Sequence, residues 1–202
     1  MSEGMLGNIP LDEIRRVGGD LLVKLGGNAG QKYFEELKKF GARQPCWVEK
    51  KSGGSKPLLE SGDNFTLPAV TLRQSVGEAF AGCHLYGNFE KWFGKCSVEP
   101  QGQVELVYGE LTRPSQDIPI LGQLFGRHET TLATVATLIK AQINGEYVPL
   151  LTNGYANIFY IRDTEGELRA VGVYRGGRVW YVGAYSVSGR CDWGAGSRVF
   201  SL

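Results

Sequence analysis

The C-terminal part of the chain, residues 155–202, reads YANIFYIRDTEGELRAVGVYRGGRVWYVGAYSVSGRCDWGAGSRVFSL. It contains nine aromatic residues, and all six of its basic residues are arginine. Short apolar runs alternate here with glycine- and aspartate-containing turns, which is typical of antiparallel strands joined by hairpins. The stretch therefore predicts three strands of an antiparallel meander, followed by a returning fourth strand.

Two turns set the pairing that we expect within the meander. The tetrapeptide DTEG (163–166) matches a type I turn with glycine at the left-handed position, and it would bring Arg162 near Glu167. Gly176 and Gly177 can both adopt the positive φ values of a two-residue hairpin turn.

A turn centred on residues 176–177 has a specific consequence. It pairs Val173 with Trp180 and places Arg175 directly opposite Arg178. Like charges facing each other across a hairpin are destabilising, so these arginines would have to turn toward water or find acidic partners.

The strongest helix pattern in the chain is HETTLATVATLIKAQ, residues 128–142. Its apolar residues recur at helical spacing, and an Asn-Gly pair ends it. Separate helices and antiparallel strands together predict an α+β fold. We expect a mainly antiparallel sheet, dominated by the C-terminal meander and covered by this one main helix.

The sequence also suggests a division of the chain. Residues 1–49 predict a strand-helix unit, with a short strand at 20–25 and an amphipathic helix at 31–40. Residues 50–57, KKSGGSKP, have the composition of a linker. Residues 58–202 would form the α+β domain, although a length of 202 residues also allows the whole chain to be one domain.

Composition limits the function classes. With 42% apolar residues, 21% charged residues and a net charge of +1, the chain is typical of a globular protein without a strongly polycationic or polyanionic surface. The four cysteines have no paired spacing, and neither a signal sequence nor a membrane-spanning run is present. We expect a cytoplasmic protein with reduced thiols and no membrane association.

Cofactor and metal signatures are weak. The glycine turn at 26–30 resembles part of a dinucleotide-binding fingerprint, but Leu25 stands where its first glycine must be. Cys83, His84 and Cys96 could join a fourth residue around zinc (Cys46, His128 or Cys191), yet no C-x-x-C knuckle supports this. The sequence therefore predicts neither a cofactor nor a metal.

Catalysis by a cysteine is the enzymatic alternative. It would use Cys83 or Cys191 as the nucleophile, and His128 is the best available base for Cys83. A solvated first helical turn explains His128 equally well. We therefore name no catalytic residue, and a small cysteine-dependent hydrolase-like enzyme remains the rival hypothesis.

The aromatic and arginine-rich sheet gives the leading hypothesis, which is a non-enzymatic binding protein. The candidate binding residues are Arg175, Arg178, Trp180, Tyr181 and Trp193. A protein partner is favoured over nucleic acid because the net charge is close to zero. A nucleic-acid-binding module and an ordinary aromatic core beneath a solvated hairpin tip are the alternatives.

Five segments of the chain form a pattern that is similar to one found in a group of small proteins. They are VKLGG (23–27), SVGEAFAG (75–82), VELVYGEL (104–111), GRVWYVGAY (177–185) and WGAGSRVF (193–200). In these segments the chain resembles uncharacterised small proteins predicted from genomes of uncultured bacteria of the candidate phyla. That resemblance implies no activity, substrate or site.

Overall fold

The computed structural model describes residues 5–6, 9–10, 25, 30–41, 56–124, 126–189 and 191–202. The chain forms two compact units, Met1–Ser55 and Lys56–Leu202. In the first unit, strands β1 (Met5–Leu6) and β2 (Ile9–Pro10) pair antiparallel, and helix α2 spans Gly30–Gly41. The helix expected at 31–40 is therefore present, whereas residues 20–24 and 50–55 lie outside the described residues.

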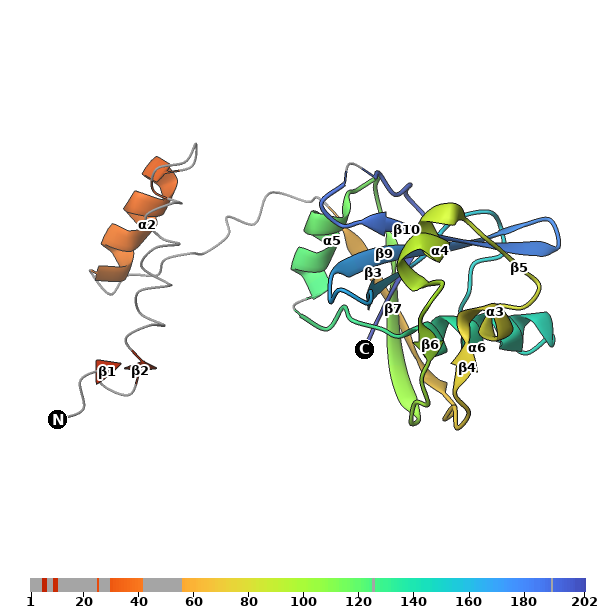
Figure 1. The fold of residues 1–202 in the computed structure, drawn as a ribbon. Coiled ribbons are helices and arrows are strands. Elements are labelled where there is room, and N and C mark those ends of the chain that lie inside the picture. Colours follow the sequence, from red (N-terminus) through yellow and green to blue (C-terminus); the bar gives the residue numbers. More distant parts are fainter. Residues whose placement is uncertain are drawn as a thin grey trace. The chain divides into compact units, whose positions relative to one another are not determined.

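The second unit is built on one seven-stranded sheet (Figure 1). Its strands, in spatial order, are β3 (Leu59–Leu67), β7 (Val104–Leu111), β11 (Arg198–Ser201), β8 (Asn157–Arg162), β9 (Leu168–Gly176), β10 (Val179–Ser186) and β5 (Cys83–Leu85). Only the β11–β8 and β10–β5 pairs are parallel. The prediction of an α+β fold with a mainly antiparallel sheet is confirmed.

Four helices and a small ladder surround this sheet. The helices are α3 (Val76–Ala79), α4 (Gly87–Phe93), α5 (Asp117–Leu124) and α6 (Leu132–Ile143), and the ladder joins β4 (Gln74–Ser75) to β6 (Ser97–Val98). Helix α6 begins at residue 132 rather than 128. The reason is that Thr131 caps it, with its Oγ1 accepting a hydrogen bond from the Thr134 N–H at 3.1 Å. No helix in the described ranges is both long enough and apolar enough to span a bilayer.

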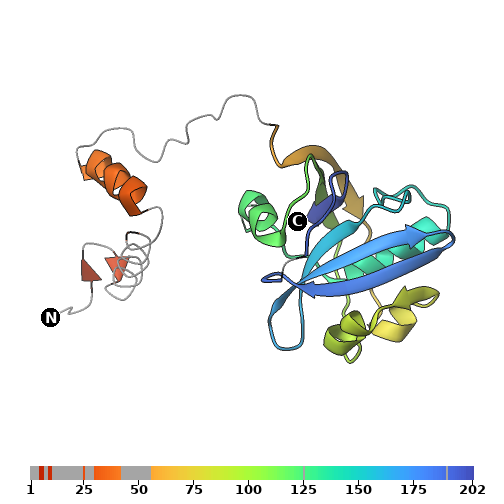
Figure 2. The same cartoon turned by 90° about the horizontal axis from the view of Figure 1, so that it is seen from above.

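The two faces of the sheet carry separate apolar clusters, because successive side chains of a strand point to opposite faces. On one face, Phe159, Val171 and Trp180 pack with the buried residues of α6. Figure 2 shows α6 running along the long β9 and β10 strands. On the other face, Tyr160 and Trp193 join a second cluster that includes Ile120 of α5.

The predicted hairpin register is wrong. The turn residues are 177–178, so Trp180 pairs with Arg175, and the expected opposition of Arg175 and Arg178 does not exist. Gly177 adopts the positive φ of +61°. Gly176 instead remains in β9, where a Cβ would lie only 2.8 Å from the Tyr181 ring. The turn at 163–166 is as predicted, with the Gly166 N–H donating to the Asp163 carbonyl at 3.0 Å.

Candidate functional site

The five residues expected to form a binding face do not lie on one surface. Trp180 and Trp193 are buried, with exposed fractions of 2% and 7%. Arg175 lies on the α6 side of the sheet, and its guanidinium carbon is 5.9 Å from the centre of the Trp180 ring. Tyr181 is half-buried and Arg178 is exposed at the hairpin tip. Only these last two residues keep an accessible position away from the core.

Tyr181 belongs to a group of four rings that we call the aromatic cluster: His84, Tyr86, Tyr174 and Tyr181. Tyr174 and Tyr181 stack with ring centroids 5.2 Å apart and planes inclined by 8°. The ring centroid of His84 lies 5.2 Å from the ring centroids of both Tyr86 and Tyr181, and the ring centroids of Tyr86 and Tyr181 are 6.1 Å apart. His84 is exposed, whereas the three tyrosines are half-buried.

Strand pairing brings these four rings together. The antiparallel β9–β10 register sets Tyr174 beside Tyr181, and the parallel β10–β5 register sets His84 on the other side of Tyr181. Tyr86, just after β5, stays beside β10 because its N–H donates a hydrogen bond to the Val182 carbonyl at 2.9 Å. The sequence pattern does not reveal His84 and Tyr86, because the contact depends on a short parallel strand about a hundred positions before β10.

The cluster is held together by polar contacts as well as by stacking. The hydroxyl groups of Tyr86 and Tyr174 are hydrogen-bonded to each other. This hydrogen bond, together with burial, raises the pKa of Tyr174 to about 12, so its hydroxyl stays neutral at physiological pH. The cluster therefore offers amphipathic rings whose hydroxyl groups can form hydrogen bonds.

The structure gives no support to a cysteine nucleophile. Burial raises the pKa of the Cys83 thiol to about 11, and it also raises the pKa values of Cys96 and Cys191. A cysteine nucleophile needs the opposite shift, because the thiolate is the reactive form. Cys83 and His84 are adjacent in β5, so their side chains point to opposite faces of the sheet. Cys46 lies outside the described residues.

Metal binding is not indicated either. Within the described ranges, no three His, Cys, Asp or Glu side chains converge closely enough to hold an ion. The proposed combination of Cys83, His84 and Cys96 is not assembled there.

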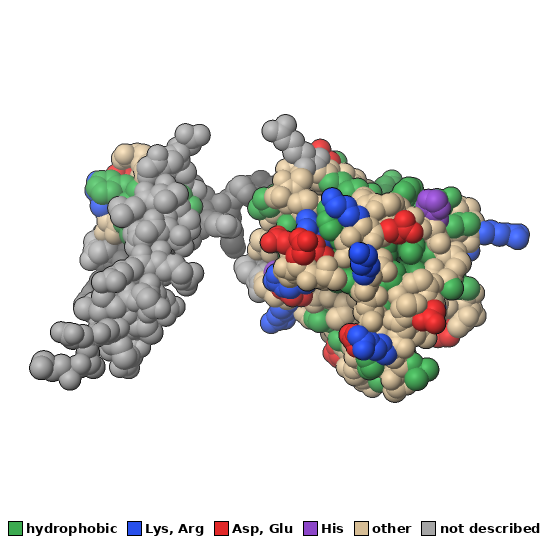
Figure 3. Space-filling view, in the orientation of Figure 1, with side chains coloured by type: hydrophobic (Ala, Val, Ile, Leu, Met, Phe, Trp, Pro, Cys, Tyr) green, Lys and Arg blue, Asp and Glu red, His purple; other side chains and the backbone are tan. Residues whose placement is uncertain are grey.

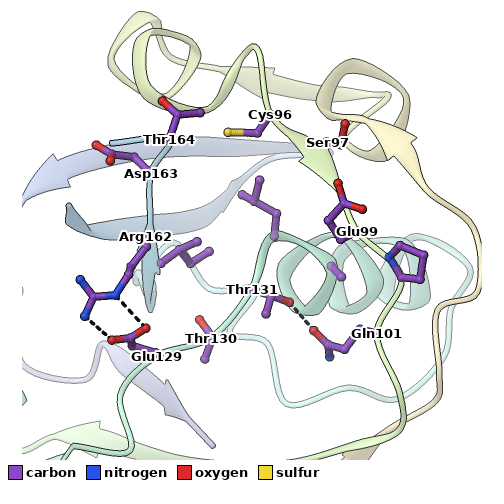
Figure 4. A pocket seen from close by; sticks show the side chains of 14 residues that line it. Cys96, Ser97, Glu99, Gln101, Glu129, Thr130, Thr131, Arg162, Asp163 and Thr164 are labelled. Atoms are coloured by element: carbon purple, nitrogen blue, oxygen red, sulfur yellow. Dashed lines mark hydrogen bonds and ion pairs between the residues drawn. The ribbon is translucent and has the colours of Figure 1, made fainter. Parts of the chain in front are cut away.

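A pocket of about 350 Å³ lies between the start of α6 and the end of β8 (Figure 4). The charged side chains of this pocket form ion pairs and hydrogen bonds with other residues of the protein. Arg162 donates from two guanidinium nitrogens to the Glu129 carboxylate. Asp163 accepts from Arg169 Nε at 2.7 Å and from two backbone N–H groups of its own turn. Glu99, the remaining acid of the lining, pairs with Arg73 at 2.9 Å. Each charged side chain among the described lining residues is therefore already paired within the protein.

A fully buried carboxylate sits at the start of α5. Asp117 Oδ1 accepts hydrogen bonds from the Tyr160 hydroxyl and from Trp193 Nε1, each at 2.8 Å. Its Oδ2 has no partner in the described part of the chain. Burial raises the pKa of Asp117, while the two hydrogen bonds act in the opposite direction. Through these two hydrogen bonds, the Asp117 carboxylate connects α5 to β8 and to the segment before β11.

Comparison of the chain with protein-family models, with curated proteins and with solved structures finds no match. The resemblance to proteins of uncultured bacteria therefore stays a prediction.

Proposed function

We propose that the protein is a non-enzymatic binding protein, which holds an acidic segment of a partner protein against the aromatic cluster and Arg178. The observation that carries this proposal is the cluster itself, in which four rings from three neighbouring chain segments contact one another and remain accessible. Tyrosine and arginine are enriched at the energetic centres of protein interfaces, since they combine apolar area with directed hydrogen bonds.

The charge of the region supports an acidic partner. None of the four cluster residues is acidic, and Arg178 is exposed at the tip of the adjoining hairpin. No ion pair of Arg178 is found within the described residues, in contrast to Arg162 and Arg169. A partner carboxylate could therefore pair with Arg178 while a neighbouring apolar side chain packs on the rings.

A protein partner is favoured over nucleic acid by the charge of the whole chain. The net charge of the chain is +1, and Figure 3 shows acidic and basic side chains interspersed on the face in view. Nucleic-acid binding relies on several unpaired cations that replace counterions along the phosphate backbone.

The proposal also keeps the cytoplasmic location expected from the cysteine pattern, which the free thiols of Cys83, Cys96 and Cys191 support.

The test is selection of a random peptide library, displayed on phage, against the purified full-length chain. We expect enriched peptides that place Asp or Glu near an aromatic or aliphatic residue. Synthetic copies of these peptides should bind at least tenfold more weakly to a Tyr174→Ala/Tyr181→Ala variant and to Arg178→Glu, because interface centres of this kind contribute more than about 1.4 kcal/mol.

Arg73→Gln provides the matched control, since Arg73 is another exposed arginine outside the cluster. Peptides that bind all variants equally would overturn the proposal, and so would a failure to enrich any peptide. A nucleic-acid module would instead bind single-stranded oligo(dT) with an affinity that falls steeply as salt increases.

A further inference from the structure

A second and larger concavity, of about 620 Å³, lies over the part of the sheet formed by β3, β7 and β11. We call it the sheet-floor pocket. Its floor includes Ser61, Val107, Val199 and Ser201, and its wall includes residues of α5 and the chain that follows. The volume falls within the range of about 300 to 1,000 Å³ that is usual for small-molecule sites. It shares no lining residue with the aromatic cluster.

The floor is apolar at its centre and polar at its margin. Val107, Leu59 and Leu124 are half-buried and supply apolar surface, and the exposed Ser61 supplies a hydroxyl group. Val199 and Ser201 lie beneath them, with exposed fractions of 1% and 6%. In the wall, Gln123 Oε1 accepts the Leu59 N–H at 3.0 Å. This bond fixes the amide so that its NH₂ group remains available as a donor.

Among the described residues that line this pocket, only Arg127 has a charged side chain, and it is a cation. Arg127 is exposed at the wall, and no Asp or Glu is among the lining residues. The Arg127 backbone carbonyl accepts the Leu202 N–H at 2.9 Å, which holds this part of the wall against β11. Its guanidinium has no ion pair within the described ranges, whereas the arginine at the smaller pocket is paired with Glu129.

We propose that the sheet-floor pocket binds an amphiphilic monocarboxylate, with the carboxylate paired to Arg127 and the hydrocarbon chain lying on Val107, Leu59 and Leu124. A single planar guanidinium matches the two oxygens of a carboxylate. A phosphate dianion would leave much of its charge without a partner here. The apolar floor supplies the remaining affinity by removing hydrocarbon surface from water. This proposal is independent of the protein-binding function.

The test is titration of the full chain with octanoate, observed by calorimetry and by backbone NMR. We expect saturable binding to one site, with chemical-shift changes at Val107, Gly109 and Ser201. Octanol and octylammonium, which have the same hydrocarbon chain without the negative charge, should bind at least tenfold more weakly. Arg127→Gln should weaken octanoate binding by about 10- to 100-fold, which is the size expected for lost charged hydrogen bonds.

Two further variants keep the result interpretable. Val107→Phe should block octanoate by filling the floor, and Arg73→Gln should leave octanoate binding unchanged because Arg73 is an exposed arginine outside the pocket. Arg127 is exposed, so its substitution is not expected to affect folding. Equal binding of octanol and octanoate, an unchanged affinity in Arg127→Gln, or shifts confined to other regions would each overturn the proposal.

Discussion

Tyr160 and Asp117 are joined by a hydrogen bond of 2.8 Å, although they are 43 positions apart in the sequence. The bond connects a central strand, β8, to the first residue of α5, and both side chains are fully buried. Trp193 donates to the same carboxylate oxygen. Three segments of the larger unit therefore depend on one acidic side chain.

Removing the Tyr160 hydroxyl should destabilise the protein. In Tyr160→Phe, the buried Asp117 carboxylate loses one of its two donors, and we expect the free energy of unfolding to fall by about 1–3 kcal/mol. Urea denaturation measures this change. The same substitution at Tyr155, which is 48% exposed, is the matched control and should have an effect below about 0.5 kcal/mol. Equal effects at the two positions would contradict the role assigned to the bond.

Asp117 should also contribute to the pH dependence of stability. Burial raises its pKa, so the folded chain binds this proton more tightly than the unfolded chain. The contribution of Asp117 therefore stabilises the fold below its unfolded pKa of about 3.9, and it is lost as the pH rises through the higher folded value.

The variant Asp117→Asn removes this titration. The difference in unfolding free energy, native chain minus variant, should therefore decrease as the pH rises from about 3 to about 7. Urea denaturation of both proteins across this range provides the measurement. The difference is needed because other carboxyls, such as Glu129 beside Arg162, have lowered pKa values and act in the opposite direction. A flat difference would show that Asp117 has the same pKa in both states.

The conformation of the hairpin can be tested at its two glycines. Gly177 has a φ of +61°, so Gly177→Val should cost about 1–2 kcal/mol, whereas Gly177→Asn should be tolerated. Gly176→Ala should displace the Tyr181 ring, because the added Cβ would lie 2.8 Å from it. Thermal unfolding and the NMR signals of Tyr181 would report these effects. Tolerance of valine at 177 would argue for a different turn.

The cysteines should be unreactive in the folded protein. With the pKa of Cys83 near 11, and those of Cys96 and Cys191 also raised, very little thiolate is present at neutral pH. In a Cys46→Ser variant, iodoacetamide should label the folded chain much more slowly than the chain in urea, and mass spectrometry would identify each site. Rapid labelling of Cys83 or Cys191 at neutral pH would revive the hypothesis of a cysteine-dependent enzyme.

The pattern of the C-terminal stretch predicts the meander well, because alternation and turn residues are local signals. It could not fix the β9–β10 register. The predicted and observed registers differ by two positions, and an even shift leaves the same side chains on each face of the sheet. Val173 and Trp180 therefore share a face in both, and the two registers differ at Gly176, which lies in β9 instead of in the turn.

The candidate site was harder to predict for a different reason. Trp180 and Tyr181 are neighbours in the sequence, yet strand alternation buries the first and leaves the second accessible. Which face is covered depends on α6, a distant element. His84 and Tyr86 could be recognised only after β5 had been placed beside β10, and three residues of parallel strand leave too weak a pattern for that.

The short strand β5 also determines how this molecule can associate with others. It pairs with only three residues of β10, Trp180–Val182. Immediately beyond it, the Asn88 side chain accepts the Ala184 N–H at 3.4 Å, so this backbone donor is already occupied. A foreign strand would have to displace β5 and Asn88 to reach β10, and β5 itself offers an edge of only three residues. The protein can thus expose tyrosine rings on a sheet face while its neighbouring edge resists the strand addition that leads to aggregation.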